Sequence, residues 1–219
     1  MRRKRVAVLI SGRGSNMAAL IEATKAVDYP AEIALVVSNV PGAGGLATAA
    51  KAGIATATVD HTTFGKDRAA FERALKDALA QNQIELVCLA GFMRLLTPWF
   101  VGQWPHRMLN IHPALLPCFK GLDTHRRALE AGVKVHGATV HFVVPEVDSG
   151  PIIAQAAVPV HDDDTEESLA ARVLAVEHRI YPLALRLVAQ GRVSVQGNRC
   201  RIAGTSEPAT ALLVPADAL

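Results

Sequence analysis

The chain has 219 residues, of which 50% are apolar and 20% are charged, and 23 Lys and Arg against 20 Asp and Glu give a net charge of +3. This composition predicts one globular domain over residues 1–219, with a core in about residues 6–191 and a flexible tail at residues 203–219. The basic end Arg2–Arg5 continues into no basic stripe with interleaved aromatic residues, so we expect no nucleic-acid partner. The absence of ~18 consecutive apolar residues predicts no membrane span, and three cysteines without disulfide or metal spacing favour a cytoplasmic protein.

The first part of the chain alternates strand-like and helix-like segments. Val6–Ile10 is a continuous apolar run with β-branched residues, which predicts a buried parallel strand. The later segments follow the same alternation, with strands at Glu32–Val37, Ile54–Val59 and Glu85–Ala90 and helices at Gly44–Lys51 and Asp67–Gln81. This alternation predicts an open, mainly parallel sheet covered by helices.

A glycine-rich turn, Ser11–Asn16, joins the first strand to the helix that follows it. It lacks the third glycine of a dinucleotide fingerprint, because Met17 stands there, and it lacks the Gly-Lys-Ser/Thr of a Walker motif. Free N–H groups at the start of a helix can bind a phosphate monoester. The alternative is a purely structural turn in which Ser15 caps the helix.

Two loops are expected to border one crevice. In an open parallel sheet whose chain winds one way and then doubles back, the loops after the first and fourth strands flank the switch point. Here those loops are Gly12–Asn16 and Gly91–Leu96. Apolar side chains such as Met93 and Leu95 more often belong to a hydrophobic core than line a ligand-binding slot. An Arg in so apolar a loop needs a partner, so Arg94 indicates contact with an anion or with backbone carbonyls.

Asn110 and His112 lie at the end of the next predicted strand, Met108–Ile111. Pro113 cannot donate to a sheet ladder, so the chain leaves the sheet at His112 and the two polar side chains share a face. An Asn amide and a His can both donate to an oxygen that becomes negative. Asp148 follows in a turn-like loop, where a carboxylate could orient and charge that imidazole. From residue types alone, a strand end with a satisfied histidine is the alternative.

The second half of the chain predicts two more strands and a long helix. The strands are expected at His136–Val144 and Ile152–Val160 as an antiparallel addition. His136 and His141 fall on opposite faces of the first of these strands, and no Cys or carboxylate has metal-ligand spacing, so no metal site is predicted.

The long helix has a predicted start and a predicted defect. Asp164 with Glu167 three residues later predicts a capping box. Pro182 should kink or interrupt the helix, because proline cannot donate an intrahelical hydrogen bond.

The order and spacing of Asn110-Ile111-His112-Pro113, then Leu115-Leu116-Pro117, then Asp148 before Gly150-Pro151 resemble the folate-dependent formyltransferases. The resemblance runs from about Val6 to Gly191. It implies a single-domain, Rossmann-like open sheet that is mainly parallel, with an antiparallel addition near the C-terminal half. It also implies transfer of the formyl group of 10-formyltetrahydrofolate to the amine of glycinamide ribonucleotide in purine biosynthesis, without a metal, and it allows a homodimer.

The resemblance also assigns roles to particular residues. In the implied reaction the amine attacks the formyl carbon, Asn110 and protonated His112 stabilise the oxyanion, and Asp148 keeps His112 charged and passes on the amine's proton. From residue type alone, Arg68 is a solvated helix charge and Glu177 is a border charge. The residues implied to bind the ribonucleotide are Gly14, Ser15, Asn16 and Glu177. The residues implied to bind the folate are Arg68, Met93, Arg94, Leu95, Leu96, Val101, Asn110, Val144, Pro145, Glu146, Val147 and Asp148.

Three other functions compete with this one. A formyltetrahydrofolate deformylase would carry a regulatory domain ahead of the first strand and a His in place of Pro113. A methionyl-tRNA formyltransferase would carry a basic tRNA-binding domain after the catalytic one, and we expect neither extra domain in a chain of this length. A non-catalytic nucleotide-binding or sensor module would keep the Gly14 turn but would not need Asn110, His112 and Asp148 together.

Overall fold

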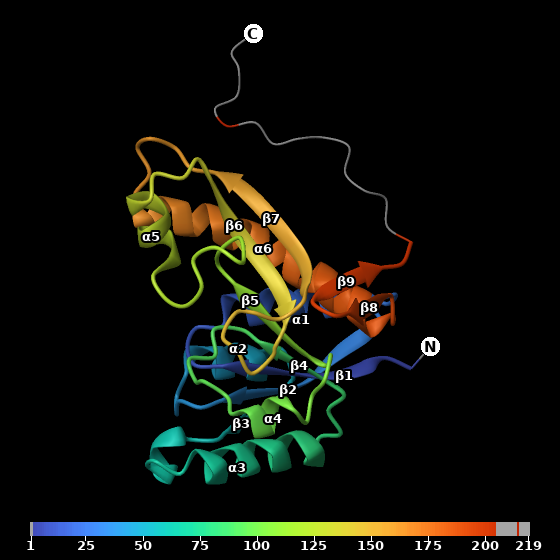
Figure 1. The fold of residues 1–219 in the computed structure, drawn as a ribbon. Coiled ribbons are helices and arrows are strands. Elements are labelled where there is room, and N and C mark those ends of the chain that lie inside the picture. The colour runs from blue at the N-terminus through green and yellow to red at the C-terminus, as the bar shows by residue number, and fades with distance from the viewer. Residues whose placement is uncertain (1, 205–213, 215–219) are drawn as a thin grey trace.

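The computed structural model describes residues 2–204 and residue 214. In this part of the chain a nine-stranded sheet has the order β3-β2-β1-β4-β5-β6-β7-β9-β8 (Figure 1). Its strands are β1 (Lys4–Ile10), β2 (Ala31–Ser38), β3 (Ala55–Thr58), β4 (Leu86–Leu89), β5 (Met108–His112), β6 (Val135–Phe142), β7 (Ile152–Pro159), β8 (Val193–Gln196) and β9 (Arg199–Ile202). The first five strands pair in parallel, and β6 runs antiparallel to both β5 and β7. The predicted fold class is therefore confirmed.

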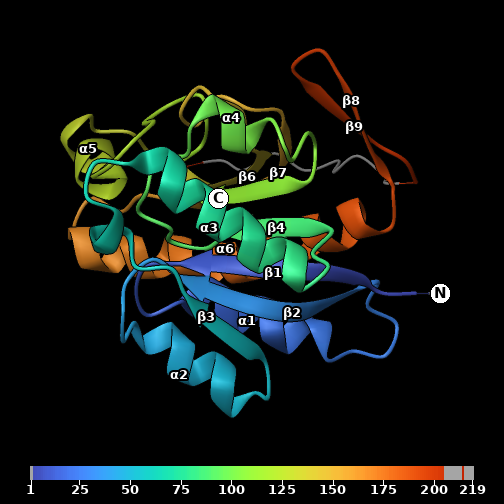
Figure 2. The ribbon, with the colours of Figure 1, turned by 90° about the horizontal axis from the view of Figure 1, so that it is seen from below.

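Helices cover both faces of the sheet. They are α1 (Ser15–Thr24), α2 (Gly44–Lys51), α3 (Arg68–Gln81), α4 (Pro98–Val101), α5 (Thr124–Glu130) and α6 (Glu166–Ala189), with a 3-10 turn, η1, at His61–Phe64. Helices α1, α2 and α6 lie on one face, and α3 and α4 lie on the other (Figures 1 and 2). The β8–β9 hairpin projects from the body of the molecule, as Figure 2 shows.

Successive side chains of β1 alternate between the two faces of the sheet, and this alternation decides which helices each residue packs against. Val6, Val8 and Ile10 belong to the core cluster that includes α1 and α6, whereas Ala7 and Leu9 belong to the cluster that includes α3 and α4. All five side chains are fully buried. Because successive side chains of a strand point to opposite faces, a strand that is apolar at every position needs helices on both sides.

The predicted switch point is present. Strand β1 lies between β2 and β4, so the chain moves outward to β3 and then returns to the other side of β1. The loops after β1 and β4 are consequently neighbours, and the Ser11 N–H donates to the Gly91 carbonyl at 3.1 Å. In open α/β sheets, ligands bind outside the carboxyl ends of strands at such a point.

The start of α1 differs from the alternative in which Ser15 caps the helix. Gly14, not Ser15, occupies the cap position, with φ 70° and ψ 42°, and Ser15 is the first helical residue. Those angles are left-handed, a conformation that glycine adopts without the steric cost a Cβ would bring. The left-handed backbone of Gly14 therefore directs the chain into α1, and no side chain caps the helix.

The start of α6 also differs. The capping box is formed by Thr165 and Ser168, one residue later than the predicted pair of Asp164 and Glu167. The Asp164 carboxylate instead pairs with Arg172 at 2.7 Å, and this guanidinium holds the pKa of Asp164 well below its usual range. The prediction is wrong by one residue because a nearby Arg competes for the carboxylate.

Pro182 does not interrupt α6, which is continuous from Glu166 to Ala189. The helix packs against α1, β6 and β7 along its length, and the Pro182 carbonyl accepts a hydrogen bond from the Tyr29 hydroxyl at 2.6 Å. Tertiary packing of this kind can override the local helix-breaking tendency of a proline.

Of the predicted tail at residues 203–219, only Ala203, Gly204 and Val214 are among the described residues, and the rest lies outside them. Within residues 2–204, no helix is long and apolar enough to cross a membrane.

The close approach of β6 and β7 yields a stability prediction. A Cβ at Gly137 would lie 2.0 Å from the Ala156 carbonyl oxygen, so Gly137→Ala must push the two strands apart. We expect it to lower the free energy of unfolding by about 2 kcal/mol or more, as overpacking does. Gly44→Ala is the matched control, because a Cβ there meets nothing within 4 Å, and its change should stay within about 1 kcal/mol. Urea denaturation of both variants tests this, and equal stabilities would contradict it.

Candidate active site

Ser11 makes hydrogen bonds to two neighbouring loops at the carboxyl edge of the sheet, and so connects three loops there. Its Oγ donates to Asn39 Oδ1 at 2.5 Å and accepts from the Met93 N–H at 2.7 Å. Its backbone N–H reaches Gly91, so the loops after β1, β2 and β4 are held together by this one small residue. Sequence analysis did not identify this role, because a serine in a glycine-rich turn has many possible partners.

His112 and Asp148 are in contact. The Asp148 Oδ2 atom lies 3.3 Å from His112 Nδ1, and both side chains are largely buried. His112 Nε2 lies 2.9 Å from the Phe119 carbonyl oxygen, which can only accept, so Nε2 carries a hydrogen. Neutral His112 thus turns the lone pair of Nδ1 toward the carboxylate, and protonation would replace that repulsion by an ion pair.

Asn110 reaches the same carboxylate through a third residue. Asn110 Nδ2 lies 3.3 Å from His141 Nε2, and His141 Nε2 lies 3.7 Å from Asp148 Oδ1. Strand pairing makes this arrangement, because Asn110 on β5 is directly opposite His141 on β6. The structure therefore brings Asn110, His112 and Asp148 to one place and adds His141, for which the sequence suggested no role.

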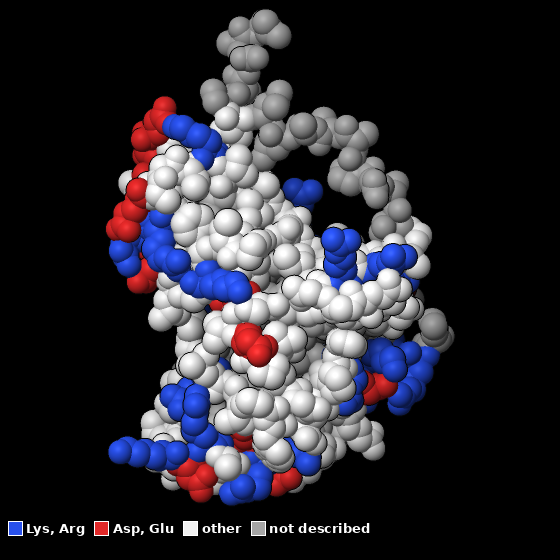
Figure 3. Space-filling view, viewed as in Figure 1, with Lys and Arg blue, Asp and Glu red and all other residues white. Residues whose placement is uncertain are grey.

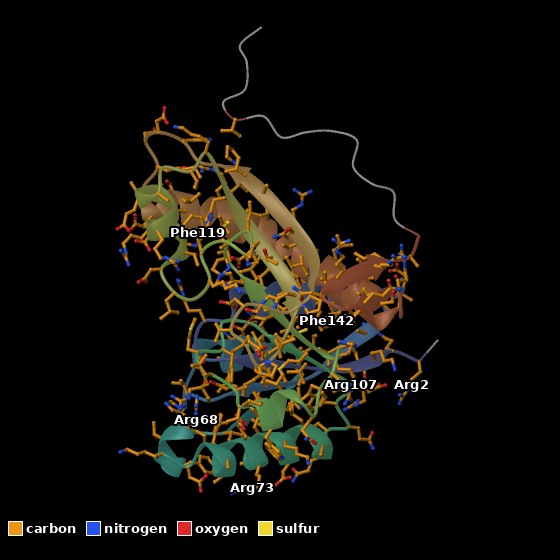
Figure 4. The ribbon with its side chains drawn as sticks, viewed as in Figure 1. Arg2, Arg68, Arg73, Arg107, Phe119 and Phe142 are labelled. Atoms are coloured by element: carbon orange, nitrogen blue, oxygen red, sulfur yellow. The ribbon has the colours of Figure 1, made fainter. Side chains whose placement is uncertain are left out.

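The loop between β5 and α5 closes over this group. The Gly121 N–H donates to Asp148 Oδ2 at 2.9 Å, and Lys120 donates to Ser149 Oγ at 2.7 Å. Phe119 has φ 52° and Asp148 has φ 47°, which is the left-handed region that a non-glycine residue seldom adopts. Such backbone conformations cost of order 1–3 kcal/mol each and concentrate at functional sites. Figure 4 shows Phe119 on this loop, beside α5.

Burial and hydrogen bonding act in opposite directions on the two central groups. Burial lowers the pKa of His112 below its ordinary value, although the Phe119 carbonyl and the Asp148 charge partly restore it. For Asp148, burial acts to raise the pKa, but the nearby His141 ring, the hydrogen bond from the Gly121 N–H and the charge of His112 hold it below its usual range. The carboxylate is therefore ionised at neutral pH, and His112 gains a proton less readily than a free imidazole.

A polar cluster of the buried Thr139 and the more exposed Gln155 holds the chain just after His112. Thr139 Oγ1 donates to the Ala114 carbonyl at 2.7 Å and accepts from the Leu116 N–H at 3.0 Å. Gln155 Nε2 donates to the Leu116 carbonyl at 2.9 Å. These bonds satisfy backbone groups that would otherwise be buried without partners, and they fix the exit of the chain from β5.

The residues predicted to bind the ribonucleotide also converge. Asn16, in the first turn of α1, donates from Nδ2 to Glu177 Oε2 of α6 at 2.6 Å, across 161 positions of sequence. Both side chains are buried. Burial raises the pKa of Glu177, while the hydrogen bond from Asn16 acts to lower it. Glu177 thus faces the glycine-rich turn and is not a solvated border charge.

Helix α3 holds the loop after β4 at two points. Arg68 donates from Nη2 to the Leu95 carbonyl at 2.9 Å. One turn later, the buried Glu72 accepts from the Thr97 N–H at 2.6 Å and also from the Thr97 hydroxyl. Arg68 lies in the first turn of α3, as Figure 4 shows. It is therefore a loop-holding residue in this structure, and Glu72 is one that the sequence analysis did not identify.

The other residues predicted to bind folate fall into two groups. In the loop after β4, the Met93 and Leu95 side chains are 68% and 63% exposed, whereas Val101 is buried in α4 and offers little surface. Arg94 has no hydrogen-bond or ion-pair partner among the residues that the structure describes. The remaining predicted residues are Leu96 and Val144, which are half-buried, and Pro145, Glu146 and Val147, which are exposed.

Charged side chains of both signs are mixed on the face of the molecule that Figure 3 shows. Figure 3 shows Lys and Arg interspersed with Asp and Glu over α5 and α3, and mostly uncharged residues in the middle of that face. Within the described part of the chain, no group of three or more His, Cys, Asp or Glu side chains is arranged to hold a metal ion.

Comparison with known proteins identifies the class. Residues 4–185 match the family described as formyl transferase, so the chain belongs to the formyl transferase family and the predicted membership is confirmed. Phosphoribosylglycinamide formyltransferase of Escherichia coli (strain K12) is 45% identical over 203 residues, which are 93% of this chain and 95% of that protein.

Two further similarities extend this finding. A solved structure of glycinamide ribonucleotide transformylase 1 from Symbiobacterium toebii superimposes with a TM-score of 0.88 at 48% identity, covering 91% of this chain and 94% of that one. The trifunctional purine biosynthetic protein adenosine-3 of Gallus gallus is 54% identical over 87% of this chain. The chain spans only 19% of the length of that larger protein.

A histidine beside the site gives a pH prediction. Burial, with a smaller effect of His125, lowers the pKa of His136 to about 4. An unfolded histidine binds a proton near pH 6.5, so between these values the unfolded state binds more protons and stability falls as the pH falls. From pH 7.5 to 5.5 His136 should account for a loss of about 1 kcal/mol.

Urea denaturation of the wild type and of His136→Leu at both pH values checks this. The variant should lose less stability than the wild type on acidification, whatever its stability at pH 7.5. The same loss in both proteins would show that His136 is not responsible.

Proposed function

We propose that this chain transfers the formyl group of 10-formyltetrahydrofolate to the amine of glycinamide ribonucleotide, giving formylglycinamide ribonucleotide and tetrahydrofolate in purine biosynthesis. The observation that carries the proposal is the meeting of Asn110, His112 and Asp148 at the sheet edge, between a helix N-terminus suited to phosphate and an exposed apolar loop. The names of the relatives, phosphoribosylglycinamide formyltransferase and trifunctional purine biosynthetic protein, support the same reaction. A cytoplasmic location and a homodimer remain predictions.

The phosphate of the ribonucleotide binds at the N-terminus of α1. The N–H groups of the first helical turn lack intrahelical partners, and the helix dipole favours an anion there. Gly14, in its left-handed conformation and without a Cβ, lets the anion approach the backbone of Ser15 and Asn16. Glu177 is held against this turn by Asn16 and accepts hydrogen bonds from the ribose hydroxyls.

The folate lies between the loop after β4 and the loop that carries Asp148. The exposed Met93, Leu95 and Val147 side chains supply apolar surface for the flat pterin ring. Arg68 and Arg94 supply positive charge for the carboxylates of its glutamate portion. Because the α1 N-terminus, the loop after β4 and Asn110 lie at one edge of the sheet, the donor's formyl carbon and the acceptor's amine meet beside Asn110.

In the reaction, the amine nitrogen attacks the formyl carbon and forms a tetrahedral intermediate with a negative oxygen. The Asn110 amide and the Nε2–H of His112 donate to that oxygen. Because this N–H now donates to the Phe119 carbonyl, the formyl oxygen takes the place of that carbonyl. Asp148 accepts the amine's proton through water. Collapse of the intermediate breaks the bond from carbon to the folate nitrogen, and this nitrogen leaves with the proton that Asp148 returns.

An assay with three acceptors separates this function from its rivals. The folate absorbance should change when 10-formyltetrahydrofolate is mixed with glycinamide ribonucleotide, and should not change with the folate alone or with charged initiator tRNA. Equal turnover without an acceptor would identify a deformylase, and turnover with the tRNA would identify a tRNA formyltransferase. Nucleotide binding without turnover, measured by calorimetry, would favour the sensor module.

The contact between Asp148 and His112 predicts the effect of removing one charge. Asp148→Asn keeps the size of the side chain but loses the carboxylate that faces His112 Nδ1, so the pKa of His112 should fall further. A positioned proton-transfer group contributes ~10² to 10⁴ in rate, and we expect kcat to fall by that order with little change in folate affinity. Steady-state kinetics and NMR titration of His112 measure the two effects.

The double variant provides the control for this prediction. His112→Ala should be impaired to a similar degree, and the double variant should be scarcely worse than either single one, because groups that act as a unit are not additive. Near wild-type kcat in Asp148→Asn, or losses that simply multiply, would show that the carboxylate does not act through the imidazole.

A further inference from the structure

His141 is a buried histidine next to the catalytic group, and it has a fixed orientation. Its ring is only 2% exposed, in the middle of the sheet on β6. Its Nδ1 atom lies 2.9 Å from the carbonyl oxygen of Phe142, and a carbonyl can only accept a hydrogen bond. Nδ1 therefore carries the hydrogen whether the ring is neutral or charged.

This bond determines what the other ring nitrogen can do. In the neutral ring, a hydrogen on Nδ1 leaves a lone pair on Nε2, which can only accept. Asn110 lies 3.3 Å away, and of its two amide ends only the NH₂ group can donate to that lone pair. With the amide turned by 180°, the Asn110 Oδ1 atom would face the lone pair and repel it. Neutral His141 therefore selects one of the two orientations of the amide.

We propose that His141 is a positioning residue, which holds the Asn110 carboxamide with its second N–H directed at the reacting formyl oxygen. The inference deepens the proposed function and rests on it. One N–H of the amide is engaged by His141, and the other has no acceptor among the residues that the structure describes. Asn110 is half-buried, so this second N–H is open to a ligand. An oxyanion donor acts best when it is oriented before the reaction.

Asp148 competes with Asn110 for the same ring nitrogen. Its Oδ1 atom lies 3.7 Å from His141 Nε2, which is beyond hydrogen-bond length, whereas the Asn110 nitrogen is within it. A protonated His141 would turn its Nε2–H toward Asp148 and would repel the NH₂ group of Asn110. His141 serves Asn110 only in its neutral form.

Three substitutions distinguish positioning from simple core packing. Gln places an amide oxygen where histidine has Nε2 and accepts from Asn110 without any charge. Asn is too short and places its amide at the Nδ1 position, and Leu fills the space without any acceptor. If His141 only fills the core, Leu should be tolerated at least as well as Gln. If it positions Asn110, Gln alone should preserve activity.

The experiment measures formyl transfer by the full chain with both substrates varied. We expect His141→Leu and His141→Asn to lower kcat about 10- to 100-fold with KM for both substrates changed less than about threefold, since a misplaced group costs rate more than binding. His141→Gln should stay within about fivefold of the wild type. In the background of Asn110→Ala, His141→Leu should cause no further loss. Equal losses in Gln and Leu variants, or full additivity with Asn110→Ala, would overturn the inference.

A second readout does not depend on the reaction. Long-range ¹H–¹⁵N NMR of the wild type should show His141 as the tautomer with hydrogen on Nδ1 at pH 7.5, and the two Asn110 amide protons should be resolved and slow to exchange. In His141→Leu the Asn110 amide should lose that protection, whereas in His141→Gln it should keep it. A tautomer with hydrogen on Nε2 would contradict the inference even if the chain formylates the ribonucleotide. Failure of formyl transfer in the wild type, with the expected tautomer, would instead contradict the proposed function.

Discussion

The carboxylate of Asp148 is the contact on which the site depends. Its two oxygens face His112 of β5, His141 of β6 and the Gly121 N–H of the loop between β5 and α5. A largely buried negative charge is costly unless groups of opposite polarity surround it. The Gly121 N–H donates to this carboxylate, and a protonated His112 forms an ion pair with it. The residue itself has a left-handed backbone, with φ 47°. The cost of burial and of strain is therefore offset only when both strands and the covering loop are in place together.

The sheet supplies the geometry that makes this contact possible. Parallel pairing of β1, β4 and β5 brings the glycine-rich turn, the apolar loop after β4 and the end of β5 to one edge. The change to antiparallel pairing at β6 then sets His141 opposite Asn110 and returns the chain to the same edge through the Asp148 loop. A further parallel strand in the place of β6 would have needed a crossover connection.

How far the sequence predicts this protein depends on how local each feature is. Continuous apolar runs such as Val6–Ile10 predict buried strands, and the switch point follows from their order, because both depend on short-range pattern and general topology. Thr165 as the cap of α6 was missed because the preceding carboxylate is drawn to Arg172. Contacts such as that between His141 and Asn110 depend on the register of two strands, which a single sequence does not determine to one residue.

The hydrogen bonds of His112 explain how the proposed reaction favours its transition state. Both ring nitrogens face protein atoms, Nδ1 toward Asp148 and Nε2 toward the Phe119 carbonyl, and burial keeps the pKa of the ring low. A neutral formyl oxygen that replaces the Phe119 carbonyl is an acceptor of similar strength, so substrate binding alone gains little from His112. As the oxygen becomes negative, the amine's proton that reaches Asp148 through water moves on to Nδ1 of His112, 3.3 Å away, and the new Nδ1–H faces the ionised carboxylate. The ion pair between His112 and Asp148 thus forms as the oxyanion forms. It therefore stabilises the transition state and not the bound substrate.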